Sequence, residues 1–342
     1  AVISCSIAAA RFFNPATSKT VREVADVSEK NWDLVLQFIH EKQYIMRGHR
    51  WELFTIAPLR ASLLQRFNIV THREGKRMRF LEHLSHITAV MSERTDGPMG
   101  SSKNAGKDRE FEENRVRFIR RHGINPREFV LAGLVQGITV RSLSRVPRGG
   151  HIADADGLIS FGPAVAIASQ DCFPLFFAPL DPSDGHALVG IAHAGWPGVV
   201  EGIAARMVTE LEFRGLDRRR NLAVAIGPGI RSCCFVVRDD ERGLHQYRDR
   251  GYYDGFIEEA GVGADGEKRW RVDLVGILLF QLRDQLFIPA ERIEVAEPCT
   301  SCGTDGSGAY RFSSWRRDGV LGANMLSAIR LATRRGTETP DR

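Results

Sequence analysis

The first group of reactive side chains follows an apolar run at residues 164–169, which leads into Gln170, Asp171 and Cys172 before Pro174 ends the run. An accessible cysteine at the end of a strand acts as a nucleophile or a metal ligand once its thiol is ionised. A buried, isolated cysteine is instead a small packing residue. The residue types alone leave both interpretations of Cys172 open.

A second apolar run ends at His193, which is followed by Ala194, Gly195 and Trp196. The small residues allow other groups to approach the imidazole closely. A lone histidine after a strand is more often structural, but one beside a cysteine on a neighbouring strand is a candidate catalytic residue. Gly198 is expected to open the next helix, whose N-terminus would favour an anion.

The third group begins with the tight loop at residues 227–229, Gly-Pro-Gly, whose backbone N–H groups could face an anion. Cys233 and Cys234 follow it and are expected to be one buried and one packed thiol. Cys299 and Cys302 have the spacing of a metal-binding knuckle. Because the sequence holds no second such pair, we do not predict a structural zinc ribbon.

The elements that position these residues form a mixed pattern. From residue 129 onward, apolar runs alternate with amphipathic segments, which predicts an α/β or α+β fold whose mixed sheet is layered with helices. The predicted strands are residues 129–135, 138–143, 164–169, 173–178, 187–192, 222–226 and 293–297. The predicted helices are residues 110–122, 198–213, 272–287 and 320–333, and residues 94–110 are predicted to be a loop.

The domain organisation predicted from these patterns is a small N-terminal unit at residues 1–65, a larger domain at residues 66–335 and a polar tail at residues 336–342. Capping signals in the first unit predict two short helices, and residues 44–54 predict two strands around Gly48. Two helices followed by a two-stranded hairpin, together with the basic residues of this unit, look like a small winged helix. Contact with nucleic acid and a role in packing or dimerisation both fit it, and the chain is expected to be a monomer or a homodimer.

Composition excludes several classes of protein. The 342 residues are 43% hydrophobic and 26% charged, which rules out a disordered or collagenous chain. The net charge of +5 suits an anionic substrate or nucleic acid but demands neither. Six unevenly spaced cysteines indicate a reducing compartment, and no apolar run approaches the ~18 residues of a membrane span. We therefore expect a cytoplasmic protein that is not inserted in a membrane.

Taken together, these segments resemble the YfiH-type family, often labelled laccase-domain or multicopper polyphenol oxidase proteins. The resemblance covers residues 66–330. Its motifs are Gln170-Asp-Cys-Phe-Pro, His193-Ala-Gly-Trp, Ile226-Gly-Pro followed by Cys233-Cys234, Cys299-Thr300 and Phe312-Ser-Ser-Trp-Arg-Arg-Asp-Gly319. The resemblance implies an α/β domain similar to the cysteine hydrolase fold of the cytotoxic necrotizing factor toxins.

The same resemblance implies a zinc or copper site made by one cysteine and two histidines, phosphorolysis of purine nucleosides, and deamination of adenosine. Cys172 and His193 match the family's cysteine and second histidine, as catalytic residues and metal ligands. The position of the first histidine is Gln136, and a carboxamide is a poor zinc ligand. We therefore expect impaired metal binding or activity, unless His72 or His151 supplies an imidazole.

The other site residues implied by the resemblance serve the substrates, purine nucleosides and phosphate. Asp171 or Asp156 is expected to act as the acid that assists departure of the base. The predicted substrate- and phosphate-binding residues are Arg73, Arg316, Arg317, Gln136 and Asp156.

Two further functions fit the same residues. In a metal-free cysteine hydrolase, Cys172 would be the nucleophile, His193 the base and Gln136 an orienting or oxyanion-binding group. The second further function is nucleoside binding without catalysis, by a degenerate domain fused to a DNA-binding winged helix in residues 1–65. A true copper laccase is not expected, because the ten dispersed histidines contain no His-x-His pair.

Overall fold

The computed structural model describes residues 44–47, 50–53, 68–70, 78–101, 108–184, 187–239, 244–248 and 253–332. The chain divides into two units, residues 1–61 and 62–342. In the first unit, β1 (Tyr44–Arg47) pairs antiparallel with β2 (Arg50–Leu53), which confirms the two strands predicted around Gly48. The two helices predicted before them and the polar tail lie outside the described residues, so the winged helix stays a prediction.

Two mixed sheets form the larger unit. The first sheet has six strands in the order β4-β5-β18-β10-β6-β8, and the second has seven in the order β3-β17-β13-β11-β12-β9-β7. The strands of the first sheet are β4 (Met78–Phe80), β5 (Ile87–Met91), β6 (Phe129–Ala132), β8 (His151–Ile152), β10 (Ala164–Ser169) and β18 (Met325–Leu331). Those of the second are β3 (Asn68–Val70), β7 (Val140–Leu143), β9 (Gly157–Ser160), β11 (Phe173–Pro179), β12 (Val189–Ala194), β13 (Leu222–Ile226) and β17 (Ile293–Ala296).

The main core lies between these two sheets. Side chains alternate along β10, so Val165 and Ile167 face this core while Ala164, Ala166 and Ala168 face the other way. The rings of Phe80 on β4 and Phe176 on β11 stack with centroids 4.7 Å apart, which joins the two sheets directly. This arrangement confirms the predicted mixed α/β class, and the likeness to the necrotizing factor toxins stays a prediction.

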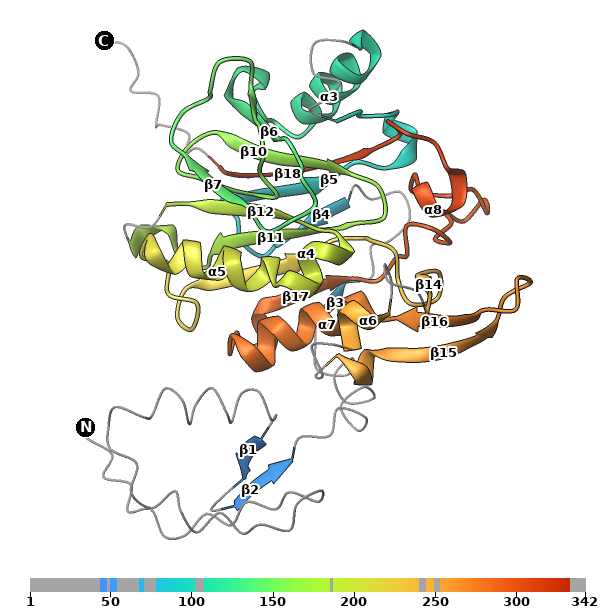
Figure 1. Ribbon diagram of the computed structural model, residues 1–342. Helices are drawn as coiled ribbons and strands as arrows, with labels where there is room; N and C mark the ends of the chain where they lie inside the picture. The colour runs from blue at the N-terminus through green and yellow to red at the C-terminus, as the bar shows by residue number, and fades with distance from the viewer. Residues whose placement is uncertain are drawn as a thin grey trace, which may run out of the picture. The chain divides into compact units, whose positions relative to one another are not determined.

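Helices cover the two outer faces (Figure 1). On the six-stranded sheet lies α3 (Arg109–Arg121), capped by Asp108 and packed through Phe118 and Ile119, as the predicted helix at residues 110–122 requires. On the seven-stranded sheet lie α4 (Trp196–Glu201), α5 (Ile203–Phe213) and α7 (Leu274–Leu279). The helices α6 (His245–Arg248) and α8 (Trp315–Asp318) are short, and β14 (Val236–Arg238), β15 (Ile257–Val262) and β16 (Lys268–Val272) form a separate three-stranded sheet.

Three helix predictions differ from the structure. The helix predicted at residues 320–333 is wrong, because Met325–Leu331 forms the strand β18 between β5 and β10. Pairing on both sides outweighs local propensity there. The helix predicted at residues 198–213 breaks at Gly202, whose φ of 88° ends α4 and begins α5. The helix predicted at residues 272–287 is α7 followed by a π-helical segment, Phe280–Gln285.

The strand predictions hold with shifted ends. The predicted strands at residues 129–135 and 138–143 are shorter, at Phe129–Ala132 and Val140–Leu143. The strand predicted at residues 187–192 continues to Ala194, so it includes His193. In the part of the chain that the structure describes, no helix is both long enough and apolar enough to cross a membrane.

Candidate functional site

Strand register brings the predicted cysteine and histidine to one edge of the seven-stranded sheet. β12 pairs antiparallel with β9 on one side, with Ala192 opposite Gly157, and with β11 on the other, with Pro174 opposite His193. Asp156 lies just before β9 and Cys172 just before β11. Because antiparallel neighbours place the start of one strand beside the end of the next, these two residues flank His193.

Three side chains converge on Gly195, the residue that begins α4. A Cβ atom at Gly195 would lie 2.9 Å from Gln136 Oε1, 3.0 Å from His193 Cε1 and 3.2 Å from Cys172 Sγ. Any larger residue would therefore fill the space between them. The structure thus brings together the three residues that the sequence singled out, and their chemical roles stay predictions.

Asp156 is the residue that holds this arrangement. Its side chain is 0% exposed, and its carboxylate accepts backbone N–H bonds from Val135 at 3.2 Å, Gln136 at 2.9 Å and Gly137 at 2.9 Å. Its Oδ1 lies 3.6 Å from His193 Nδ1. Burial opposes its charge, but His193 and the N–H groups of Gly137 and Val135 lower the pKa of Asp156 overall. The predicted contact of Asp156 with a nucleoside is not favoured, because no part of the side chain is exposed.

His193 is held as a cation when no metal is bound. Burial alone would lower its pKa, but the neighbouring negative charges of Cys172 and Asp156 raise the pKa of His193 to about 9. At neutral pH the imidazole of His193 is therefore protonated beside the Cys172 sulfur, with its Nδ1 turned to Asp156. This order of cysteine, histidine and carboxylate suits nucleophilic, acid–base or metal-binding chemistry.

Two residues at this edge adopt left-handed backbone conformations that non-glycine residues seldom take. Gln136 has a φ of 63° and Asp171 a φ of 64°. Such conformations cost about 1–3 kcal/mol and are concentrated at functional sites, where surrounding contacts hold them. The bond from Gln136 N to Asp156 serves this purpose for Gln136.

The Asp171 side chain ties three segments together. Its Oδ1 accepts a hydrogen bond from Thr300 Oγ1 at 2.7 Å, and its Oδ2 accepts bonds from Ser314 Oγ at 3.0 Å and Arg316 N at 2.8 Å. Its backbone carbonyl accepts from Ile230 N at 2.7 Å. Both carboxylate oxygens are thus engaged, which favours a positioning role over the predicted role as a proton donor.

We expect Asp171→Asn to lower the free energy of unfolding by ~1–3 kcal/mol, because an amide NH2 group cannot accept a hydrogen bond, so either Thr300 Oγ1 or Arg316 N loses its acceptor. Asparagine tolerates a positive φ, so backbone strain does not change. Chemical denaturation measures the difference. Asp265→Asn is the control, since its carboxylate pairs with Arg269 on the surface, and equal stability of the two variants would contradict this role.

The predicted phosphate-binding arginines are already engaged or lie outside the described residues. Arg317 donates five hydrogen bonds, and binding phosphate would require breaking some of them. The acceptors are Thr300 O, Ser301 O, Phe312 O and both carboxylate oxygens of Asp318. The Nη1 of Arg316 donates to Val236 O at 2.8 Å and to Cys234 O at 3.3 Å, but Arg316 is exposed, so it is the better placed of the two. Arg73 lies outside the described residues.

Of the two histidines considered as replacement ligands, only His151 belongs to the described residues. His72 lies outside the described residues. His151 is exposed on β8, with its Nδ1 3.2 Å from Gly149 O, and no group of metal-binding side chains among the described residues includes it. Gln136 therefore stays the third side chain at this site.

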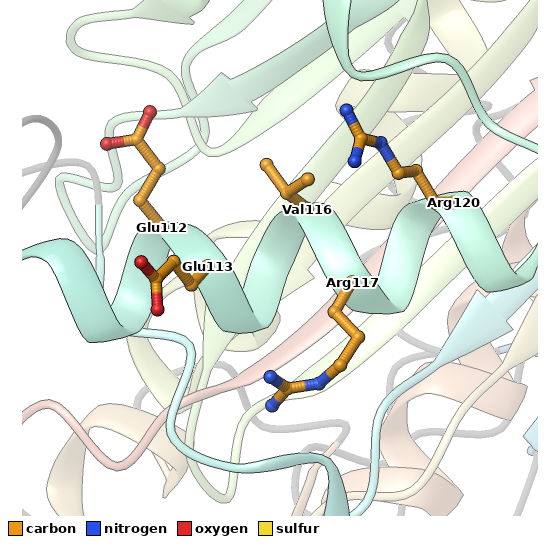
Figure 2. Close-up of a pocket in the computed structure, with 5 residues that line it drawn as sticks. All are labelled: Glu112, Glu113, Val116, Arg117 and Arg120. Carbon is orange, nitrogen blue, oxygen red and sulfur yellow. The ribbon is translucent and has the colours of Figure 1, made fainter.

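The outer face of α3 carries a hollow that is not part of this site (Figure 2). Glu112, Glu113, Val116, Arg117 and Arg120 line it. The close-up shows their side chains spreading from one helix, with the acidic pair towards one end and the basic pair towards the other. The acidic and basic side chains of this surface spread apart and do not meet at one point, so we assign no reaction to it.

A second group of reactive residues lies in two loops after β13 and β17. The sulfur atoms of Cys233, Cys234, Cys299 and Cys302 all lie within 4.8 Å of one another, a geometry that could hold a metal ion. The prediction that Cys299 and Cys302 lack a second pair is therefore wrong, because the vicinal cysteines supply it. A usable signal was present in the sequence, since each pair follows a continuous apolar strand.

Three thiols of this cluster, those of Cys233, Cys299 and Cys302, differ in acidity. Burial opposes ionisation of Cys299, but backbone N–H groups of Arg231, Cys302 and Ser301 bring its pKa below the usual value. Burial and the neighbouring sulfurs raise the pKa of Cys302 to about 11 and raise that of Cys233 as well. Without a cation, Cys299 is thus the thiol most readily ionised among these three.

Comparison with known proteins places both groups of residues in a shared region. Residues 97–332 match the family described as multi-copper polyphenol oxidoreductase laccase. The purine nucleoside phosphorylase YlmD of Geobacillus stearothermophilus is 29% identical over 270 residues, which cover 73% of this chain and 90% of that protein. A purine nucleoside phosphorylase of Deinococcus radiodurans is 29% identical over 226 residues, which cover 66% of this chain and 78% of that protein.

Solved structures agree with this match. The hypothetical protein YfiH of Bacillus licheniformis superposes with a TM-score of 0.62 at 26% identity, covering 75% of this chain and 97% of that one. YlmD of Geobacillus stearothermophilus superposes with a TM-score of 0.60 at 25% identity, covering 77% of this chain and 98% of that one.

Proposed function

Because the chain belongs to the multi-copper polyphenol oxidoreductase laccase family, also called the laccase-domain or YfiH family, and is similar to purine nucleoside phosphorylases within it, we propose that it phosphorolyses purine nucleosides. The observation that carries this proposal is the convergence of Cys172, His193 and Gln136 around Gly195, inside the matched region. The substrates would be a purine nucleoside and phosphate.

Phosphorolysis joins a phosphate oxygen to C1′ of the ribose while the bond from C1′ to the purine nitrogen breaks and its electron pair stays on the purine. The departing base needs a nearby donor that stabilises this charge. The imidazolium of His193 and the carboxamide of Gln136 are the donors beside Gly195. Asp156 keeps the imidazole ring oriented, and Asp171 holds the loop that carries Cys172.

The same residues fit a zinc ion, although the third donor is weak. The Cys172 sulfur and the His193 nitrogen that faces away from Asp156 are favoured zinc ligands, and Gln136 Oε1 adds a neutral oxygen. A carboxylate behind a ligating histidine is the usual support for such a site. A bound zinc ion would supply the positive charge that the His193 proton otherwise supplies. Proton and metal compete for this nitrogen, so zinc affinity should rise with pH up to about 9.

We expect Gln136→His to tighten zinc binding by about tenfold or more, because imidazole is a far better zinc ligand than a carboxamide. Histidine also tolerates the φ of 63° at this position. Competition with a chelator of known affinity measures the change. Gln285→His adds an imidazole elsewhere and serves as the control, and equal affinity of the two variants would show that Gln136 does not contact the metal.

Deamination of adenosine is the second activity proposed for the same site. It requires an activated water that attacks C6 of the purine while the bond from C6 to the amino group breaks and ammonia leaves. A metal held by Cys172 and His193 would lower the pKa of that water. Phosphate plays no part in this reaction. Inosine formed from adenosine without phosphate would therefore identify it.

A metal-free cysteine hydrolase is the alternative function, favoured by the alignment of Cys172, His193 and Asp156. In that mechanism the thiolate attacks the substrate, the bond to the leaving group breaks and His193 gives that group its proton, and water then releases the product from the sulfur. The Gln136 amide binds the developing negative charge. Binding of nucleic acid through residues 1–65 stays a separate prediction, for which duplex binding by the full chain is the test.

Chromatography of inosine, guanosine and adenosine after incubation with the protein distinguishes these functions. Free base and ribose 1-phosphate that appear only when phosphate is present would support phosphorolysis. Free ribose formed equally with and without phosphate would support hydrolysis instead. Absence of any product, with phosphate and zinc supplied, would contradict the proposed function.

A further inference from the structure

We propose that Cys233, Cys234, Cys299 and Cys302 form a tetrathiolate metal site of the structural zinc type, separate from the site at Cys172. Their sulfur atoms lie within 4.8 Å of one another, and Sγ of Cys233 is 3.6 Å from Sγ of Cys302. In a tetrahedral site with metal–sulfur bonds of about 2.3 Å, the sulfurs are about 3.8 Å apart. The cluster therefore needs only small side-chain movements to enclose a zinc ion.

The backbone around Cys299 has the form of a metal-binding turn. Gly303 N donates a hydrogen bond to Cys299 O at 2.8 Å, and a Cβ at Gly303 would lie only 2.6 Å from that oxygen, so this position requires glycine. The backbone N–H of Arg231 points at the Cys299 sulfur at 3.4 Å. Hydrogen bonds of this kind stabilise a thiolate, which is the form that binds metal.

Protein contacts already hold the two loops of the cluster side by side. Gly229 and Cys299 form a parallel β-bridge, and Thr300 N donates to Gly229 O at 3.1 Å. In the other loop, Cys234 N donates to Arg231 O at 2.9 Å and closes a turn that carries both vicinal cysteines. The four sulfurs are thus gathered before any metal binds, which reduces the entropy that binding must overcome.

The charges around the four cysteines also favour a bound cation, because positive side chains lie near the sulfur atoms. Four thiolates and a divalent ion carry a net charge of about −2. The half-buried Arg231 interacts electrostatically with Cys233 and Cys299, and its guanidinium donates to Ala296 O, so it would offset part of that charge. Arg316, on α8, contacts the same loop through its Nη1, which donates to Cys234 O at 3.3 Å.

A metal here would stabilise the edge that carries the candidate active site. The two cysteine loops also provide Ile230 N and Thr300 Oγ1, which bind the backbone and the side chain of Asp171, each at 2.7 Å. Asp171 directly precedes Cys172. Metal bound by the four cysteines would therefore position Cys172 without contacting substrate.

Metal analysis of the full chain tests this site without measuring activity. The parent is Cys172→Ser, which removes the other candidate thiolate ligand, and we expect it to retain about one zinc ion per chain after dialysis. Adding Cys233→Ser and Cys302→Ser, both at exposed positions, should remove that zinc, whereas adding Ser232→Ala should not. Cobalt added to the metal-free parent should give the thiolate charge-transfer and tetrahedral d–d bands, and these should be absent from the variant with both substitutions.

Three outcomes would overturn the proposal. The parent could hold no zinc and give no cobalt bands, or zinc could persist when Cys233 and Cys302 are replaced. The third outcome concerns wild-type protein that holds no metal at the cluster. If a count of its free thiols, made after denaturation without reduction, is two below the number of cysteines in the sequence, a disulfide is present in place of the metal. None of these readouts depends on turnover of nucleosides, so they are separate from the test of the proposed function.

Discussion

Replacing Cys172 with alanine should lower the rate of phosphorolysis by about 10²–10⁴-fold, the range for loss of a positioned catalytic group. The substitution removes the sulfur beside His193, which is also the strongest candidate metal ligand beside Gly195. The rate of base release from inosine in the presence of phosphate measures the loss. Because the alternative hydrolase also depends on this thiol, both activities should disappear.

A second readout shows whether the loss arises from the site itself. The charge of Cys172 contributes to the raised pKa of His193, so in metal-free Cys172→Ala this pKa should fall below about 9. Cys5→Ala, outside the region shared with the family, is the matched control for loss of a thiol. Full activity in Cys172→Ala would rule out both mechanisms.

Asp156→Asn should lower zinc affinity and activity by about 10–100-fold, the usual cost of losing a carboxylate behind a ligating histidine. The variant keeps the size of the side chain but loses its charge and one of the acceptors for the N–H groups of Gln136 and Gly137. His193 then loses the partner that orients its ring. Because Asp156 also raises the pKa of His193, the pH range over which zinc affinity rises should end below 9.

Titration of the His193 ring protons by NMR in the metal-free protein measures that pKa directly. We expect about 9 in the wild-type protein and a lower value in Asp156→Asn. Glu294→Gln is the matched control, because Glu294 is another buried carboxylate that accepts a backbone N–H, from Leu81 at 2.9 Å. An unchanged His193 pKa in Asp156→Asn would show that the 3.6 Å approach of the two side chains has no electrostatic effect.

The sequence alone determined which strands are buried and where two reactive residues lie on them. The runs at residues 164–169 and 222–226 are continuous in apolar residues, a local property that reports burial on both faces, and both are strands with these limits. Cys172 and His193 were found because reactive residues at the ends of such runs share an edge when the strands pair.

Only the tertiary structure decided what lies between segments distant in the chain. Met325–Leu331 is a strand because β5 and β10 flank it, and no local pattern reports those partners. Asp156 became the support of His193 through the register of β9 and β12. Cys233 and Cys302 are 69 residues apart in sequence but meet because the parallel strands β13 and β17 end side by side. Strand pairing depends on contacts between segments that are distant in the sequence, and it determines which residues come together in both candidate sites.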